Sequence, residues 1–506
     1  MEILNSSQMG IADAYAINET GIPSAVLMEN AAISVVDEVM AAMPNAVSAA
    51  IVTGTGNNGG DGFAVARLLI NAGLACDIYL ACDETKLKGD ALINFNILKN
   101  YDAPIFNVEQ NDLPSFADYD FVVDALFGTG LARPLEGFYE ALVQNINLTA
   151  NFVVAVDIPS GLSGDTHNVI GECVDADLTV TFARPKLPHV MYPARGFCGD
   201  IVVADISIPD FAVDEADCNI FLLDENTLPC TPPREPDSYK GDFGHAVMAG
   251  GSEGKSGAVF MASRACARCG AGLTTTAVPE GLIQAAEIVN PEIMSIRLAG
   301  DTHFTSAGAE KLSEFMKGKT VLAIGPGIGR EEETAEFVKN VVSMTDTPLI
   351  IDADGINLIG DMPLDKLSGR CILTPHIGEF ARLIGKDKEH IMSERLELAM
   401  LFAQQNDIVL VLKSADTIIA LPSGEVFVNT TGSPSLSKGG SGDCLTGLIA
   451  GFVSQGYDLD ESACLGVYTL GRTAEIVSEG VNEKSVLTTD IIENIWKTLN
   501  ELEENS

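Results

Sequence analysis

The sequence predicts an α/β protein of two domains, each with a parallel sheet covered by helices on both faces. Short apolar runs alternate with segments of helical periodicity through almost the whole chain, which is typical of this fold class. The length of 506 residues exceeds what one compact domain usually holds. Four prolines within residues 229–236 interrupt the alternation, and we place the domain boundary there because neither a helix nor a central strand tolerates them.

In the first half, helical spacing is clearest at Val36, Val39, Met40 and Met43, which predicts one buried helical stripe. Apolar runs then predict six strands. They lie at residues 49–53, 75–81, 120–125, 151–157, 178–183 and 199–206.

After the prolines, the same alternation predicts a second set of elements. Strands are expected at residues 245–249, 320–325, 348–353, 371–374 and 408–413, and helices at 441–455, 461–479 and 488–502. The chain is thus divided into a first domain of residues 1–225, a Pro-rich linker of residues 226–238 and a second domain of residues 239–506.

The charge balance is strongly acidic, with 30 basic and 71 acidic side chains and a net charge of −41. The excess is not confined to a tail, because residues 1–230 alone carry 8 basic and 32 acidic side chains. Such a charge repels nucleic acid and anionic membranes, so we expect neither as a partner. An anionic ligand must therefore be held by local groups.

The eleven cysteines are odd in number and mostly lie in apolar runs, which favours reduced thiols in a cytoplasmic protein. Cys266 and Cys269 form a C-x-x-C, but no second pair or cluster of histidines accompanies them, so we expect no metal site there. No secretion signal or membrane-spanning stretch is recognisable. We expect a cytoplasmic homo-oligomer.

A glycine-rich loop follows the first predicted strand and opens a helix, with Gly54, Gly56 and Gly59 in the pattern G-x-G-x-x-G. Glycine there allows a tight turn and lets phosphate approach backbone N–H groups at a helix N-terminus. Asn58 and Asp61 are unusual in a plain pyrophosphate loop, because their side chains bring polar contacts of their own.

Two more polar loops follow predicted strands, where open α/β sheets bind ligands. Asp124 ends one strand, while Asp157 and Ser160 follow another. Either aspartate could simply cap the next helix. Three polar strand ends at one crevice favour a binding site instead.

The segments N-N-G-G-D-G, V-D-A-L-F-G-T-G-L and D-I-P-S-G-L, in this order and spacing, resemble the epimerase domain of the NAD(P)H-hydrate repair enzymes, over about residues 1–225. The resemblance implies a Rossmann-like, three-layer α/β/α domain that interconverts the R and S hydrates of NADH and NADPH (NADHX and NADPHX). It implies an acid/base role for Asp157 and potassium ligation by Asn58, Asp124 and Ser160. The implied substrate-binding residues are Asn57, Asn58, Gly59, Gly60, Asp61, Gly128, Thr129, Gly130, Leu131, Ala132, Arg133, Pro134 and Asp157.

In the second half, Gly254, Lys255 and Ser256 lie between a strand and a helix, as in a phosphate-binding P-loop. Asp352 could then be the acidic partner that holds Mg²⁺. However, Ala249 occupies the place of the first glycine of that pattern.

A stronger pattern is S-K-G-G-S-G-D at residues 437–443, which opens a predicted helix. Its consecutive N–H groups would bind a phosphoryl group, and Asp443 is placed to take a proton from an attacking hydroxyl. An aspartate in a first helical turn can also be a mere cap. The arrangement resembles the ribokinase-like kinases.

Five further segments narrow this resemblance: A-G-G-S, G-P-G-I-G, D-A-D-G-I-N, L-T-P-H-I-G-E-F-A-R-L and V-L-K-S-A-D-T. Together they are similar to the ADP-dependent NAD(P)H-hydrate dehydratases, over about residues 235–506. The resemblance implies a ribokinase-like α/β domain that consumes ADP, uses Mg²⁺, dehydrates the S hydrate and releases AMP and phosphate. Ser414 departs from the family, which usually has glycine there, and Ile377 replaces the usual proline.

The resemblance also implies the ligand contacts of this domain. The hydrated dinucleotide would contact Ala258, Gly327, His376 and Asp443, and the adenosine nucleotide would contact Lys413, Ser414, Ala415, Asp416, Thr417 and Gly442. Lys438 could add a phosphate contact. The alternative is a kinase for a small alcohol fused to a Rossmann-like ligand-binding module.

Overall fold

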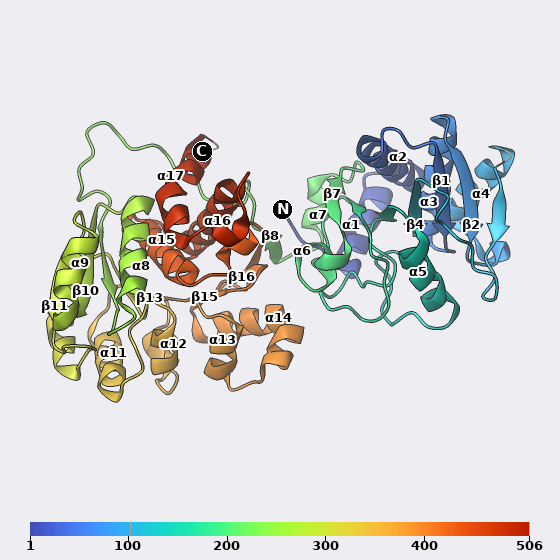
Figure 1. Ribbon diagram of the computed structural model, residues 1–506. Helices are drawn as coiled ribbons and strands as arrows, with labels where there is room; N and C mark the ends of the chain where they lie inside the picture. Colours follow the sequence, from blue (N-terminus) through green and yellow to red (C-terminus); the bar gives the residue numbers. More distant parts are fainter. Residues whose placement is uncertain (102, 505–506) are drawn as a thin grey trace. The chain divides into compact units, whose positions relative to one another are not determined.

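In the computed structural model, residues 1–101 and 103–504 are described, and the chain forms two compact units (Figure 1). The N-terminal unit contains Glu2–Ile220, and the C-terminal unit contains Met1 and the chain from Phe221 onward. The division lies before the Pro-rich segment, because β8 (Ile220–Leu222) is already a neighbour of β17 (Val426–Asn429) in the C-terminal sheet. Residue 225, the expected end of the first domain, lies a few residues beyond this division.

The N-terminal unit has a seven-stranded parallel sheet in the order β3-β2-β1-β4-β5-β6-β7. This order changes direction between β1 and β4, where sheets of this kind bind ligands. All six predicted strands are confirmed, whereas β3 was missed because it is a three-residue edge strand with no buried residue. The strands are β1 (Ser48–Thr53), β2 (Ala75–Leu80), β3 (Ile105–Asn107), β4 (Phe121–Ala125), β5 (Val153–Val156), β6 (Leu178–Phe182) and β7 (Asp200–Ala204).

Two apolar clusters cover opposite faces of this sheet, so the predicted three-layer arrangement is confirmed. Ile51 of β1 lies in the cluster with α2, α3 and α4, while Val52 lies in the cluster with α5. The helices are α1 (Ser6–Asn18), α2 (Ser24–Ala42), α3 (Asn57–Asn71), α4 (Gly89–Leu98), α5 (Phe138–Thr149), α6 (Leu187–Val190) and α7 (Asp210–Asp214).

The predicted stripe on the first clear helix was partly wrong. Met43 lies just beyond the end of α2, and of the four residues only Val39 is fully buried. The stripe that faces the core is formed instead by Leu27, Met28, Ala31, Ala32, Val35 and Val39.

The C-terminal unit has a ten-stranded sheet in the order β11-β10-β9-β12-β13-β14-β15-β16-β17-β8. It is mixed rather than wholly parallel, since β16 pairs antiparallel with β15 and with β17. Its strands include β9 (His245–Ala249), β10 (Leu273–Pro279), β11 (Met294–Leu298), β12 (Val321–Ile324), β13 (Leu349–Ile351), β14 (Cys371–Leu373), β15 (Val409–Leu412) and β16 (Thr417–Ala420). The sequence missed β10 because three consecutive threonines interrupt its apolar run.

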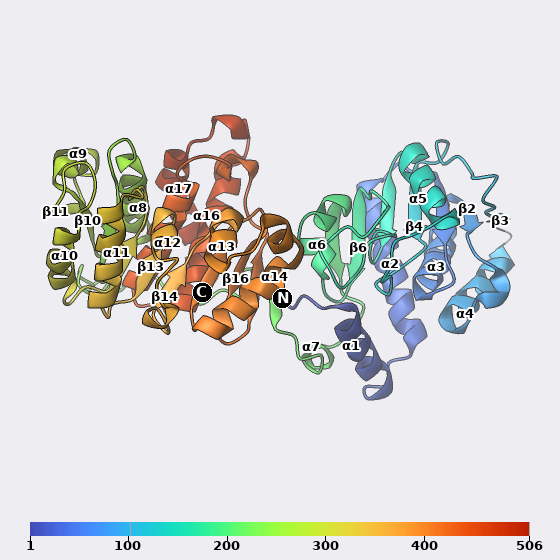
Figure 2. The same ribbon diagram turned by 90° about the horizontal axis from the view of Figure 1, so that it is seen from below.

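Helices cover both faces of this sheet, with α8, α15, α16 and α17 on one face and α11, α12 and α13 on the other (Figures 1 and 2). The three predicted C-terminal helices are confirmed as α15, α16 and α17. The helices are α8 (Ser256–Cys269), α9 (Ile283–Val289), α10 (Ala309–Met316), α11 (Glu332–Met344), α12 (Asp354–Leu358), α13 (Ile377–Ile384), α14 (Lys388–Asn406), α15 (Ser441–Ser454), α16 (Leu459–Ser478) and α17 (Thr488–Glu504).

The C-x-x-C cysteines lie on α8 with both thiols buried. Burial raises the pKa of the Cys266 thiol to about 12, so it stays protonated and unreactive. Within residues 1–101 and 103–504, no group of three or more His, Cys, Asp or Glu side chains is arranged to hold a metal ion. None of the described helices combines the length and apolar character needed to cross a membrane.

Candidate functional sites

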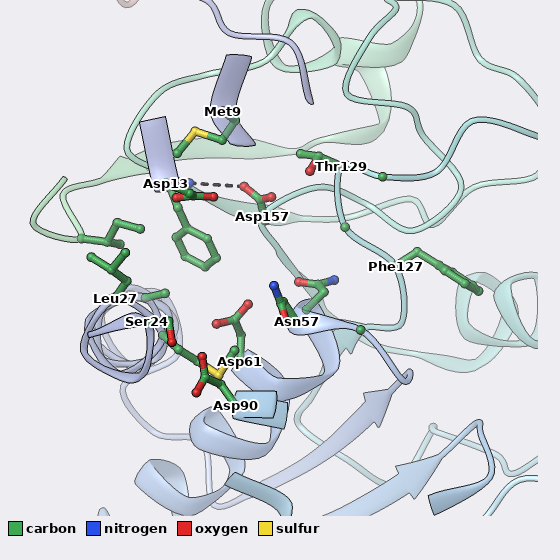
Figure 3. Close-up of a pocket in the computed structure, with 18 of the residues that line it drawn as sticks. Met9, Asp13, Ser24, Leu27, Asn57, Asp61, Asp90, Phe127, Thr129 and Asp157 are labelled. Atoms are coloured by element: carbon green, nitrogen blue, oxygen red, sulfur yellow. Dashed lines mark hydrogen bonds between the residues drawn. The ribbon is translucent and has the colours of Figure 1, made fainter. Parts of the chain in front are cut away.

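The loops that follow β1, β4 and β5 meet in one pocket of about 660 Å³ in the N-terminal unit (Figure 3). Asn57, Asn58 and Asp61 line it from the start of α3, and Asp157 lines it from the end of β5. The loop after β4 contributes residues 128–131. The pocket therefore lies at the point where the strand order changes direction.

Two glycines of the G-x-G-x-x-G pattern are required by backbone packing. A Cβ atom at Gly54 would lie 2.2 Å from the carbonyl oxygen of Leu126, and one at Gly59 would lie 2.1 Å from the carbonyl oxygen of Gly54. Gly60 likewise packs against Met28 rather than facing open space. The residues of the expected binding set that do not line the pocket are Gly59, Gly60, Ala132, Arg133 and Pro134.

Asp157 follows β5 in a left-handed backbone conformation, with φ of 65°. Its Oδ1 accepts hydrogen bonds from Lys186 Nζ at 2.7 Å and Thr181 Oγ1 at 3.0 Å. Burial would raise the pKa of Asp157, but the Lys186 ammonium outweighs it and the pKa lies below the usual range. Asp157 is therefore ionised at neutral pH and can accept a proton.

Sequence reasoning missed Lys186, which is only 1% exposed and lines the same pocket. Its ammonium donates to Asp157, to Thr181 Oγ1 at 2.9 Å and to the Phe182 carbonyl oxygen at 3.1 Å. The only available signal was its place three residues after the end of the predicted strand 178–183. Asp13 of α1 also lines the pocket and was missed.

The expected potassium ligands are oxygen-bearing side chains around the loop after β4. Asp124 is fully buried, and its carboxylate accepts hydrogen bonds from Ser160 Oγ at 2.7 Å and Ser160 N at 2.8 Å. Burial raises the pKa of Asp124 to about 6 despite these bonds. Asn58 packs against Gly128, and its buried carboxamide has no hydrogen-bond partner in the described structure. These three side chains offer amide, carboxylate and hydroxyl oxygens, which are suitable ligands for a hard cation such as potassium. The amide without a partner is free to be one of them.

In the C-terminal unit, the carboxyl ends of β12, β13, β14 and β15 are neighbours, and a motif loop follows each of them. Asp352 follows β13 and is 1% exposed. Its Oδ1 accepts hydrogen bonds from Thr374 Oγ1 at 2.8 Å and from Lys413 Nζ at 2.7 Å. Lys413 N also donates to the Pro375 carbonyl oxygen, so His376 and Lys413 lie on adjacent strand ends.

Asp443 lies in the first turn of α15, after Gly440 with φ of 102°. A Cβ atom at Gly442 would lie 3.2 Å from Lys413 Nζ, so the ammonium is beside the N-terminus of this helix. Burial raises the pKa of Asp443 to about 7, the Asp352 carboxylate adds to this, and Lys413 opposes it. This carboxyl can therefore exchange a proton near neutral pH.

His376 is the N-cap of α13, where its Nδ1 accepts the N–H groups of Gly378 at 2.9 Å and Glu379 at 3.3 Å. Burial lowers the pKa of His376, Glu379 opposes this, and Lys413 adds to the lowering. The ring is neutral at neutral pH, so it carries its proton on Nε2. Ala258 and Gly327 adjoin one another, since a Cβ at Gly327 would lie 3.0 Å from Ala258 Cβ.

Two side chains of the expected nucleotide-binding stretch bind other protein groups instead. Asp416 is 2% exposed and forms a buried ion pair with Arg395. Ser414 Oγ lies 2.9 Å from Asp416 Oδ1, where a glycine would leave that contact unmade. These side chains shape the turn that carries Lys413, Ala415 and Thr417.

Lys438, a possible phosphate contact, binds other protein groups in the structure. Its ammonium donates to the carbonyl oxygens of Lys484, at 2.7 Å, and Val486, so it stabilises the loop that precedes α17.

The structure also argues against a P-loop at residues 251–256. The Lys255 ammonium is exposed and lies 3.4 Å from Asp354 Oδ2. The N–H group of Glu253 donates to Thr302, and that of Lys255 donates to Ser252. A P-loop needs such N–H groups free to bind phosphate.

Both units are similar to known protein families. Residues 24–187 match the family described as YjeF-related protein N-terminus, and residues 246–497 match the NAD(P)H-hydrate dehydratase family. The bifunctional NAD(P)H-hydrate repair enzyme of Moorella thermoacetica is 37% identical over 521 aligned residues, covering 100% of this chain and 98% of the relative. That of Thermofilum pendens is 34% identical, covering 100% and 97%.

Among solved structures, a ribokinase-like protein from Enterococcus faecalis is similar to 56% of this chain and 96% of its own, with 28% identity and a TM-score of 0.51. The ribokinase-like fold of the C-terminal unit is thereby confirmed. With relatives matched along their full length and both domain families in the same order, this chain belongs to the family of bifunctional NAD(P)H-hydrate repair enzymes.

Proposed function

We propose that the N-terminal unit interconverts the R and S hydrates of NADH and NADPH, and that the C-terminal unit dehydrates the S hydrate at the expense of ADP. The observation that carries the second activity is Asp443 at the start of α15, beside the ion pair of Lys413 and Asp352. The first activity rests on Asp157 and Lys186 in the pocket at the ends of β1, β4 and β5.

Dehydration begins with attack of the substrate hydroxyl on the terminal phosphorus of ADP. Asp443 takes the hydroxyl proton, the new O–P bond forms, and the old P–O bond breaks to release AMP. The N–H groups at the start of α15, with Lys413 beside them, bind the transferring phosphoryl group. Ala258, Gly327 and His376 would hold the hydrated dinucleotide.

The phosphorylated intermediate then loses phosphate. The C–O bond breaks with help from the ring-nitrogen lone pair, and the neighbouring carbon loses a proton to water, which restores the ring double bond. Phosphate leaves far more readily than hydroxide, which explains why a nucleotide is consumed. Because Asp416 and Ser414 bind Arg395 and one another, the turn 413–417 would contact the nucleotide mainly through its backbone and Lys413.

Asp352, whose Oδ1 already binds Thr374 and Lys413, and the phosphate oxygens of the nucleotide would hold Mg²⁺. When bound, Mg²⁺ neutralises charge on the phosphoryl group. In the N-terminal unit, Asn58, Asp124 and Ser160 would hold potassium, which would supply positive charge for an anionic substrate. The unpartnered carboxamide of Asn58 supports this assignment.

The decisive assay incubates the protein with hydrated NADH, ADP and Mg²⁺ and follows the absorbance of reduced nicotinamide. A mixture of R and S hydrates should be recovered completely, because epimerisation feeds the S form to dehydration. Accumulation of a phosphorylated product without recovery of NADH would instead indicate a small-alcohol kinase. Recovery of only the S fraction would refute epimerisation.

We also propose a cytoplasmic location and a homo-oligomer. Eleven free cysteines are consistent with a reducing compartment. Gel filtration with light scattering of the purified chain would test the assembly.

A further inference from the structure

Asp13 lies on α1, outside every motif loop, yet its side chain lines the pocket together with Asp157 (Figure 3). Helix α1 is tied to the loops of the site at its N-terminal end. Ser6 N donates to Asp165 Oδ1 at 2.8 Å, and Ser6 Oγ donates to the Thr129 carbonyl oxygen at 2.8 Å. The position of Asp13 is therefore linked to a loop that lines the same pocket.

The carboxyl group of Asp13 makes no hydrogen bond or ion pair with the described residues. Burial raises its pKa to about 6, Lys186 opposes this, and Asp157 adds to it. The neighbouring Asp157 differs, because Lys186 holds it ionised at 2.7 Å. One pocket thus contains a carboxylate and a carboxyl that can carry a proton, which is the usual arrangement of an acid and a base.

Inverting the hydrated carbon requires two proton transfers. The hydroxyl lies on the carbon bonded to the ring nitrogen, so it departs as water only if it receives a proton, and the water that returns must lose one. We propose that Asp13 is the catalytic acid of epimerisation, opposite in role to Asp157 as the base. This inference rests on the proposed epimerase function.

The reaction then balances. Asp13 gives its proton to the hydroxyl, the C–O bond breaks, and the ring-nitrogen lone pair forms a C=N⁺ bond. A water molecule adds to the other face of that carbon, its oxygen forming the new C–O bond, and Asp157 takes its proton. The C=N⁺ electron pair returns to nitrogen. One proton has left Asp13 and one has reached Asp157, so exchange with solvent resets the pair.

The other ionisable groups of the pocket suit this role less well. Burial raises the pKa of Asp61 well above its usual value, and Asp157, Asp13 and Asp90 add to it, which favours its protonated form as a hydrogen-bond donor. His189 lies outside the pocket lining, and burial lowers its pKa to about 3, so its ring stays neutral. Asp13, whose pKa is raised to about 6, can both carry a proton and release it near neutral pH.

The test compares Asp13→Asn with a matched control, Asp37→Asn, which removes the same charge from an exposed position on α2. Pure R hydrate is supplied without ADP, so that only epimerisation proceeds, and appearance of the S form is followed by chromatography. Asp13→Asn should lower kcat at least about 100-fold with KM unchanged, whereas Asp37→Asn should match the wild type. Dehydration of pure S hydrate with ADP should be unchanged in both variants.

The pH dependence of kcat/KM and chemical rescue distinguish a catalytic role of Asp13 from a purely structural one. Wild-type kcat/KM should fall about tenfold per pH unit above about 6, because the acid must be protonated while facing Lys186, Asp157, Asp61 and Asp90. Asp13→Asn should lack this fall. Formate that takes up a proton in the cavity left by the side chain should restore activity to Asp13→Ala, because formic acid supplies the missing acid.

Asp13→Asn with more than one third of wild-type epimerisation would overturn the proposal, and so would activity lost without formate rescue. A wild-type chain that dehydrates S hydrate but does not convert R hydrate would refute the proposed epimerase function itself.

Discussion

Both sites contain a lysine paired with an aspartate, but the proposed base belongs to that pair in only one of them. Each has a lysine that binds an aspartate at 2.7 Å beside the carboxyl ends of parallel strands, Lys186 with Asp157 and Lys413 with Asp352. In the N-terminal unit the paired aspartate is itself the proposed base, and the ammonium keeps its pKa low. In the C-terminal unit the proposed base is Asp443, outside the pair, and its pKa is raised to about 7.

The difference shows that the placement of one lysine decides what a buried carboxyl can do. A base that must act while ionised is paired directly with the cation. A base that must take a proton from a hydroxyl during phosphoryl transfer gains proton affinity from burial and from a neighbouring carboxylate. In a chain of net charge −41, these lysines also supply local positive charge for polyanionic substrates.

The largest effect is expected from Asp443→Asn. It should lower dehydration on the order of 10³-fold, because asparagine cannot take the hydroxyl proton. Epimerisation, assayed on pure R hydrate, should be unchanged because Asp443 belongs to the other unit. A dehydration rate within tenfold of wild type would contradict the role of Asp443 as the base, and so would the loss of both activities together.

The next effect concerns pH. Because the pKa of Asp443 lies at about 7 and the ionised form is the base, dehydration is fully active above that pH and is lost as pH falls. We expect kcat/KM to decline about tenfold per pH unit below about 7. Rates measured at saturating ADP across this range check it. A flat profile there would contradict the raised pKa.

Replacing Asn58, whose side-chain amide has no hydrogen-bond partner in the described structure, should affect the two activities differently. In Asn58→Leu the affinity for potassium should weaken at least about tenfold, as when a metal-site group is lost. Potassium activation of epimerisation should weaken accordingly, while dehydration stays constant. Sodium at equal ionic strength is the control, and an unaltered potassium response would exclude Asn58 as a ligand.

The smallest effect distinguishes the two candidate phosphate sites of the C-terminal unit. Lys255→Ala removes an exposed ion pair with Asp354, so ADP consumption should change less than about threefold. Lys413→Ala, the matched comparison, should reduce ADP consumption far more. The reverse order would revive the P-loop at residues 251–256.

Much of the fold and the placement of the motif residues followed from local patterns. Apolar runs followed by glycine and aspartate predicted where Asp124, Asp157 and Asp352 would end strands, and the structure has each at that position. The helix opened by Gly440 and Asp443 was equally visible. Short or polar strands were not, because β3 and β10 lack a continuous apolar run.

Local patterns could not predict contacts between side chains that lie far apart in the sequence. Lys438 looked free for phosphate, yet carbonyl oxygens almost 50 residues further along the chain bind it. Asp416 looked like a ligand contact, yet Arg395 on α14 pairs with it in the core. Lys186 and Asp13 carried no motif at all.

The sequence by itself determined two α/β domains, the places of the apolar strands and of the loops after them, and the aspartates at the strand and helix ends, because backbone propensity and apolar periodicity act over neighbouring residues. Only the tertiary structure decided which cation each aspartate meets. Lys186 and Asp157 are 29 residues apart, and Lys413 and Asp352 are 61 apart, so each contact exists only once the strands are assembled. Since burial and those contacts set the pKa values, the division into base and acid is a property of the folded chain.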